Sequence, residues 1–165
     1  MVDAEAGAAE RLFELVAHEG ALVVGVGHPL RGDDAAGSAI AASLAPRFFG
    51  RAIDAGPVPE SYLGPLLAVP ARPVVFLDAV AHGARPGSWC VVPAESLAVR
   101  PADTHRASLG LLAGLLGAHG IGVWVVGIEP RQLTPGAPLS PEVERATAEL
   151  VGLLTAAMTE APLHA

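Results

Sequence analysis

Short apolar runs alternate with longer amphipathic segments along the chain, and this alternation predicts strands and helices in turn. Residues 21–26, 73–80 and 122–128 are apolar and short enough for buried strands, and residues 51–55 predict a further strand. Residues 88–92 follow the turn of residues 83–87 and predict a strand at the edge of the sheet.

Apolar residues at helical spacing predict helices between these strands. Leu12, Leu15 and Val16 share one face of such a segment. The expected helices cover residues 8–18, 35–44, 61–67 and 108–116, and a last helix begins after Ser140. Ser140 as N-cap and Pro141 at the first helical position are both favoured at a helix start.

Strands that alternate with helices predict an α/β fold. We expect one domain over residues 1–165, a three-layer sandwich whose mostly parallel, mixed five-stranded sheet is flanked by helices. Residues 1–7 and 160–165 are expected to be frayed ends.

Composition supports a compact protein of the cytoplasm. Of the 165 residues, 52% are hydrophobic and 16% are charged, which is typical of one domain with a sizeable core. The formal net charge of -7 and the scattered basic residues argue against nucleic acid or an anionic membrane as partner. No apolar run approaches the ~20 residues of a membrane span, and the acidic N-terminus does not resemble a secretory signal.

A glycine-rich turn that ends in two carboxylates follows the first predicted strand. Gly27 and Gly32 have the spacing of the two P-loop glycines, but Asp33 and Asp34 stand where that motif needs Lys and Ser or Thr. Two carboxylates would repel a phosphate, and Leu30 occupies the position of the third glycine of a dinucleotide fingerprint. The turn therefore indicates a site for a cation or a polar substrate.

Three candidate metal ligands are predicted at the carboxyl edge of the sheet. Asp34 follows the first strand, Asp78 lies near the end of another, and His105 precedes the helix at 108–116. Two carboxylates and an imidazole suit zinc or nickel and leave coordination positions open. Each residue taken alone also has a structural explanation: a first-turn carboxylate for Asp34, a strand end that needs a partner for Asp78, and a surface position for His105.

Several blocks of residues, in a fixed order along the chain, are shared with a known family. The blocks are residues 24–37, Asp54-Ala55-Gly56 with Glu60, Leu77-Asp78-Ala79-Val80 with Gly83 and Pro86-Gly87, Thr104-His105, residues 126–130 and residues 139–143. In these blocks the chain resembles the hydrogenase maturation endopeptidases, which trim the C-terminus of the large subunit of nickel-iron hydrogenases. The resemblance covers nearly the whole domain.

The resemblance implies an aspartyl-type endopeptidase that acts on the large-subunit precursor. Asp34, Asp78 and His105 match the three metal-contacting positions of the family. The nickel is implied to come with the substrate, and no organic cofactor is implied. Asp33 or Asp34 would handle the proton of the cleavage reaction. We expect a monomer that meets its precursor transiently.

The chain departs from the usual family pattern near this site. His28 replaces a common Asn, Ala35 replaces a frequent Gly, and Pro57 stands where the family has Thr. Pro57 lacks a backbone donor and a hydroxyl. His28 is a candidate fourth ligand or proton shuttle, and Gly56 is a further candidate beside it.

Two other functions stay open at the level of sequence. One is a non-proteolytic maturation or binding factor on the same scaffold, in which the changes at His28 and Pro57 accompany loss of cleavage. The other is a small-molecule hydrolase or nucleotide enzyme of the α/β type. Neither a Gly-x-Ser-x-Gly elbow nor a His-Glu-x-x-His motif occurs, which argues against the common serine hydrolases and zinc proteases.

Overall fold

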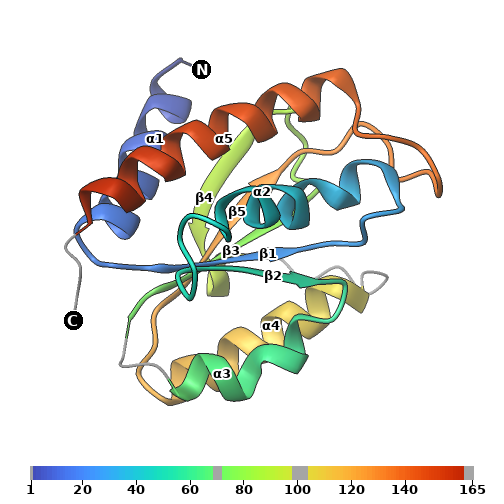
Figure 1. Cartoon of the computed structure of the whole chain (residues 1–165). Helices are drawn as coiled ribbons and strands as arrows, with labels where there is room; N and C mark the ends of the chain where they lie inside the picture. Colours follow the sequence, from blue (N-terminus) through green and yellow to red (C-terminus); the bar gives the residue numbers. More distant parts are fainter. Residues whose placement is uncertain (1, 69–71, 98–103, 162–165) are drawn as a thin grey trace.

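A computed structural model of the chain describes residues 2–68, 72–97 and 104–161, with residues 2–5 and 104–107 described by their backbone alone. Figure 1 shows the strands and helices in these ranges. The strands are β1 (Leu22–Val26), β2 (Ala52–Gly56), β3 (Val74–Ala79), β4 (Trp89–Pro93) and β5 (Val123–Ile128). The α-helices are α1 (Val2–Ala17), α2 (Ala36–Leu44), α3 (Leu63–Ala68), α4 (Thr104–Ala118) and α5 (Pro141–Glu160). The 3₁₀ turns are η1 (Gly32–Ala35), η2 (Pro59–Tyr62) and η3 (Ala94–Ser96).

The described strands form one mixed sheet in the order β2-β1-β3-β5-β4. β1, β2, β3 and β5 are parallel, and β4 pairs antiparallel with β5 at the edge. The predicted fold class and the predicted edge position of residues 88–92 are thus confirmed. The chain leaves β1 for β2 on one side and then crosses to β3 on the other. Ligands of open α/β sheets bind outside the carboxyl ends of the strands at such a switch of order.

Helices cover both faces of the sheet (Figure 1). α1, α2 and α5 pack over one buried core, to which Leu12, Val75 and Leu150 belong. α3 and α4 pack over the other core, which contains Phe76 and Leu112. Val75 and Phe76 are neighbours in β3 and enter opposite cores because successive side chains of a strand point to opposite faces.

The boundaries of several helices differ from the prediction. α1 begins at Val2 and not at Ala8, because the alanine-rich start has high helix propensity without the apolar periodicity on which the prediction relied. α4 begins at Thr104, ahead of its first leucine, and the helix expected at 61–67 is divided between η2 and α3. In the part of the chain that the structure describes, no helix is both long and apolar enough to cross a membrane.

Candidate functional site

The glycine-rich turn after β1 folds back on η1 too closely for a side chain to fit. A Cβ on Gly27 would lie 1.8 Å from the carbonyl oxygen of Asp34, and the φ of Gly27 is +143°. The N–H of Gly27 donates to the carbonyl of Gly56, with an N···O distance of 2.9 Å. The backbone N–H of His28 donates to Oδ2 of Asp34 at 3.0 Å. These contacts fix the Asp34 carboxylate beside the carboxyl end of β1.

α2 lies directly on the carboxyl ends of β1 and β3. A Cβ on Gly37 would lie 2.0 Å from the carbonyl oxygen of Leu77 and 2.5 Å from that of Val26, so only glycine permits this approach. Asp34 stands in η1 just before α2, and η1 contacts β3. Asp78 follows Leu77 in β3 and is buried. The structure therefore brings Asp34 and Asp78 to the same edge of the sheet, at the switch of strand order.

His105 lies in the first turn of α4, and its side chain is outside the described residues. β5 begins at the amino edge of the sheet shortly after α4 ends at Ala118. α4 therefore runs antiparallel to β5 and begins at the carboxyl edge, as Figure 1 shows. Among the side chains that the structure does describe, no group of three or more His, Cys, Asp and Glu could hold a metal ion.

Asp33 has surroundings quite unlike those of Asp34. Its side chain is fully buried, and its carboxylate accepts hydrogen bonds from three backbone N–H groups and one hydroxyl. The donors are Arg131 N at 2.8 Å, Gln132 N at 3.0 Å, Ser140 N at 2.6 Å and Ser140 Oγ at 2.9 Å. The Asp33 carboxylate thus joins the turn after β1 to the segment that leads from β5 to α5. Because its hydrogen-bonding capacity is used inside the protein, this geometry supports a structural role.

Ser140 stands at the N-cap of α5 as predicted, but its side chain makes no capping hydrogen bond. The hydroxyl donates to Asp33 instead. The position of the helix start was therefore predicted correctly, whereas the partner of the serine was not. That partner lies 107 positions away in the sequence, beyond the reach of any local pattern.

His28 is half-buried, and its ring nitrogen Nδ1 accepts the N–H of Leu30 at 3.1 Å. In the neutral ring this arrangement leaves the proton on Nε2. Nε2 is then a hydrogen-bond donor, which favours a contact with an oxygen atom over coordination of a metal.

Gly56 uses both its backbone groups within the protein. Its N–H donates to Oδ1 of Asp54 at 3.0 Å, and its carbonyl accepts the N–H of Gly27. Ser38 in α2 donates to the same oxygen of Asp54 at 2.6 Å. Gly56 therefore connects the end of β2 to the glycine-rich turn, and its φ of +59° explains why glycine stands there.

Glu129 belongs to the shared block at residues 126–130 but was not among the predicted site residues. It follows β5, is buried, and its Oε2 accepts the N–H groups of His82 at 2.6 Å and Gly83 at 3.1 Å. The same oxygen lies 3.3 Å from Nδ1 of His82. Glu129 thereby shapes the loop that follows Asp78 and β3. The sequence did contain a signal for this residue. A carboxylate directly after an apolar strand is expected to be buried, and a buried carboxylate needs hydrogen-bond donors.

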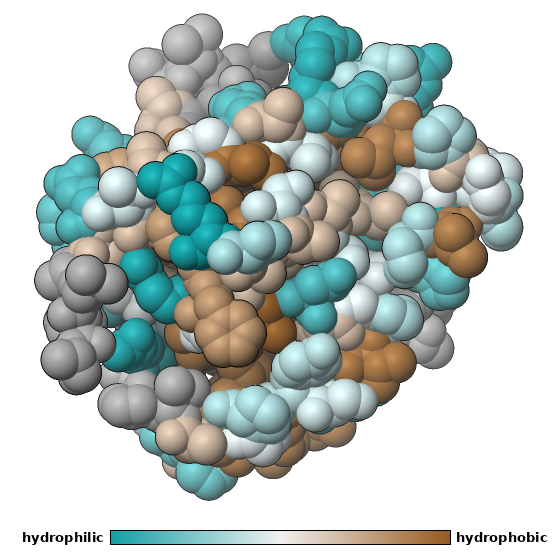
Figure 2. Space-filling model, viewed as in Figure 1, coloured by the Kyte–Doolittle hydropathy of each residue, from teal (hydrophilic) through white to brown (hydrophobic). Residues whose placement is uncertain are grey.

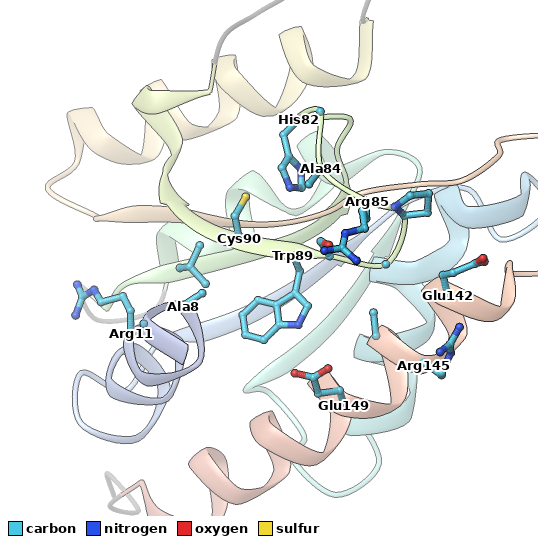
Figure 3. Close-up of a pocket in the computed structure, with 17 residues that line it drawn as sticks. Ala8, Arg11, His82, Ala84, Arg85, Trp89, Cys90, Glu142, Arg145 and Glu149 are labelled. Atoms are coloured by element: carbon cyan, nitrogen blue, oxygen red, sulfur yellow. The ribbon is translucent and has the colours of Figure 1, made fainter. Parts of the chain in front are cut away.

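A groove of about 950 Å³ lies between α1, α5 and residues 82–91 (Figure 3). Figure 3 shows Arg11, Arg145 and Glu149 around Trp89 in this groove. None of the candidate residues Asp34, Asp78 and His28 lines it, so it is separate from the acidic edge. Cys90 is on its wall, and burial raises the pKa of the Cys90 thiol. The resulting scarcity of thiolate at neutral pH argues against a nucleophilic cysteine.

Comparison with known proteins identifies the family. The family model for HycI, hydrogenase maturation protease, matches residues 39–157, which include Asp78 and His105 and begin just after the glycine-rich turn. The chain belongs to the hydrogenase maturation protease family. It is thus a peptidase of hydrogenase maturation that removes the C-terminal extension of the large subunit. Membership in a peptidase family decides against the non-proteolytic and small-molecule alternatives.

Solved structures of hydrogenase maturation proteases share this fold. The [NiFe] hydrogenase maturation protease HycI from Thermococcus kodakarensis KOD1 is 22% identical, with a TM-score of 0.79 over 90% of this chain and 99% of that one. The hydrogenase maturating endopeptidase HybD from E. coli is 24% identical, with a TM-score of 0.70 over 85% and 92%. An endopeptidase from Escherichia coli is 27% identical, with a TM-score of 0.65 over 85% and 92%. No curated protein is similar enough to count as a relative.

Proposed function

We propose that this hydrogenase maturation protease recognises a nickel ion that the large-subunit precursor already carries, through Asp34, Asp78 and His105. The observation that supports the proposal is the close packing of Gly37 against the carboxyl ends of β1 and β3. This packing brings Asp34, just before α2, and Asp78, in β3, to the same edge of the sheet. These residues match the metal-contacting positions in the family that the sequence resembles. Two carboxylates and an imidazole suit nickel, and they leave positions open for the substrate's own ligands.

Asp34 is the carboxylate to which we assign proton transfer. Within the described part of the chain, its carboxylate accepts one hydrogen bond, from the N–H of His28 to Oδ2. Oδ1 is thus available for an ion or a proton. The ion would polarise the scissile carbonyl or acidify a bound water, and Asp34 would accept the proton that is released. Asp33 is left out of this assignment because its oxygens are occupied by four donors.

His28 is assigned to the substrate rather than to the metal. Its Nδ1 accepts the N–H of Leu30, so Nε2–H is left as a donor, on a residue whose backbone N–H is bonded to Asp34. We assign this Nε2–H group a hydrogen bond to a carbonyl oxygen of the bound precursor. This bond would help to position the peptide relative to the Asp34 carboxylate.

The protease is proposed to act in the cytoplasm as a monomer that meets its precursor transiently. The acidic net charge of -7 supports a protein substrate over nucleic acid or an anionic membrane. Analytical ultracentrifugation at several protein concentrations tests this prediction. A monomer has the mass of one chain at every concentration.

The test is mass spectrometry of the cognate precursor after incubation with the protease, with and without nickel in the precursor. We expect the wild-type protein to shorten only the nickel-loaded precursor. Asp34→Asn should slow this cleavage by at least about 10²-fold, because the proton acceptor is lost while the size of the side chain is kept. Glu144→Gln, which removes an exposed carboxylate in the first turn of α5, is the matched control and should cleave like the wild type.

Two results would overturn the proposal. Cleavage of nickel-free precursor at the wild-type rate would show that the ion does not direct the reaction. Cleavage by the Asp34→Asn variant at the wild-type rate, with an unchanged melting temperature, would remove Asp34 from the chemistry. His105→Gln extends the same assay to the third proposed contact.

A further inference from the structure

Three loops at the carboxyl edge of the sheet each present an exposed apolar side chain. Leu30 follows β1 and is 67% exposed, Val58 follows β2 and is 45% exposed, and Leu133 follows β5 and is 44% exposed. The other exposed large hydrophobic residues of the described chain lie elsewhere: Phe49 precedes β2, and Leu111 and Leu115 are on α4. Figure 2 shows apolar atoms on the surface at the right of the view, where the loops after β1 and β5 lie in Figure 1.

Polar contacts hold the loops after β1 and β5 in place. The carbonyl of Leu30 accepts the N–H of Gly136 at 2.8 Å, and the N–H of Asp33 donates to the carbonyl of Gln132 at 3.0 Å. The side chain of Gln132 occupies the space where Gly32 would carry a Cβ, and it also accepts the N–H of Thr134 at 2.8 Å. These contacts therefore join the loops after β1 and β5 to each other. Neither Leu30 nor Leu133 needs to be buried for the loops to keep this shape.

An apolar side chain on a loop that is already ordered is well suited to bind a protein. Docking then buries apolar surface without the entropy cost of ordering the loop. A partner that covers this edge of the sheet would bury the exposed apolar side chains on the loops around it. Arg31 is exposed next to Leu30, and arginine beside apolar residues is typical of the centre of protein interfaces.

The position of the three loops identifies the partner. Asp34 and Asp78 lie at the edge that these loops border, with Val58 on the β2 side and Leu133 on the β5 side. A protein substrate whose peptide bond lies at Asp34 meets the sheet edge next to these loops. The partner is therefore the substrate itself.

We propose that Leu30, Val58 and Leu133 form an apolar rim that docks the folded body of the large-subunit precursor around the acidic edge. This inference rests on the proposed function, because it assumes that cleavage takes place at Asp34 and Asp78. The rim adds the surface that selects the precursor. It requires a complementary apolar patch on the precursor around the point where its extension begins.

The experiment compares three variants in steady-state cleavage of the nickel-loaded precursor. The double variant Leu30→Ser with Leu133→Ser should raise KM at least about tenfold and leave kcat within about twofold, since burial of a leucine contributes that much to binding. The double variant Leu30→Met with Leu133→Met keeps the apolar surface and should retain the wild-type KM. Phe49→Ser removes a more exposed apolar residue outside the rim and is the control.

If KM is unchanged in the double serine variant, the rim does not dock the precursor, and the proposed function is unaffected. If the wild-type protein fails to cleave the precursor, the proposed function fails, and calorimetric titration of the same precursor still decides the rim. A Kd that is tenfold higher for the double serine variant than for the wild type supports the rim, and an equal Kd overturns it. Leu133→Ser alone replaces the double variant in both assays if the latter melts at a lower temperature than the wild type.

Discussion

Asp33 and Asp34 are identical neighbours in the sequence and opposite in environment. The 3₁₀ turn η1 directs Asp33 into the protein, where it accepts four hydrogen bonds. Asp34 is half-buried, and from the described residues its carboxylate accepts one hydrogen bond, from the N–H of His28. A carboxylate satisfied by so many donors is held in place and stabilises the fold, while one with an available oxygen can serve chemistry. Of the two acids, the structure therefore favours Asp34 for function.

Replacing Asp33 by Asn separates these two roles. The NH₂ group of the amide replaces one of the two oxygens, so it faces the N–H of Ser140 in one orientation and the N–H groups of Arg131 and Gln132 in the other. In either orientation the hydrogen bonds that remain are no longer made to a charged group. We expect a loss of about 3 kcal/mol in the free energy of unfolding and a melting temperature lower by about 6–12 °C. Urea denaturation and thermal scans measure both.

Asp34→Asn is the matched comparison for this prediction, since it makes the same chemical change one residue later. Its free energy of unfolding should stay within about 1 kcal/mol of the wild type, because it loses one partly exposed hydrogen bond. Equal destabilisation by the two variants would contradict the division of roles between Asp33 and Asp34.

At the scale of elements, α2 owes its position to two glycines. A Cβ on Gly25 of β1 would lie 2.2 Å from the carbonyl oxygen of Gly37, and one on Gly37 would lie 2.0 Å from that of Leu77. Backbone therefore packs on backbone, and the helix is closer to the sheet than side chains would allow. The same approach places η1, with Asp34, against the end of β3.

Gly37→Ala should disturb both stability and activity. The added methyl group has no room against the backbone of β3, so α2 must move away from the sheet and carry Asp34 with it. We expect a loss of about 1–3 kcal/mol in the free energy of unfolding together with slower cleavage of the precursor. Urea denaturation and the mass assay measure the two effects.

Gly152→Ala provides the control within a helix. Gly152 is exposed in α5 with no atom near its would-be Cβ, so alanine there should stabilise the protein by about 0.5–1 kcal/mol. If Gly37→Ala raised the free energy of unfolding as Gly152→Ala is expected to, α2 could not be packed as closely on the sheet as described.

The sequence predicted these elements better than it predicted their contacts. Apolar runs located β1, β3 and β5, and the Ser140-Pro141 pair located the start of α5, because burial and capping leave local patterns. The rule for open α/β sheets placed Asp34 and Asp78 at one edge. The partners of Asp33 could not be predicted, since Arg131 and Ser140 meet it only through the tertiary fold.

At the scale of the whole molecule, the sheet divides the interior into two cores. Leu150 of α5 is fully buried in the core on one face, and Leu112 of α4 is buried in the core on the other. β1, β3 and β5 contribute side chains to both cores, so neither can form without the sheet. This arrangement is that of a single α/β domain; its predicted extent over residues 1–165 stays a prediction.

Leu150→Ala and Leu112→Ala test the unity of the domain. Each substitution should leave a cavity and lower the free energy of unfolding by about 2.7–5 kcal/mol. We expect one unfolding transition in each variant, with the same midpoint by far-UV circular dichroism and by tryptophan fluorescence. A variant that unfolds in two steps, one for each face, would contradict the single domain.

The Asp33 carboxylate holds the loop after β5 at both of its ends. Arg131 and Gln132 donate to it from one end of the loop, and Ser140 donates to it from the other. Between these two fixed ends, the exposed side chain of Leu133 makes no contribution to the Asp33 hydrogen bonds, so its replacement leaves both ends of the loop in place. We therefore expect that the preference for one precursor over another can change at the tip of this loop without any change at Asp34 and Asp78.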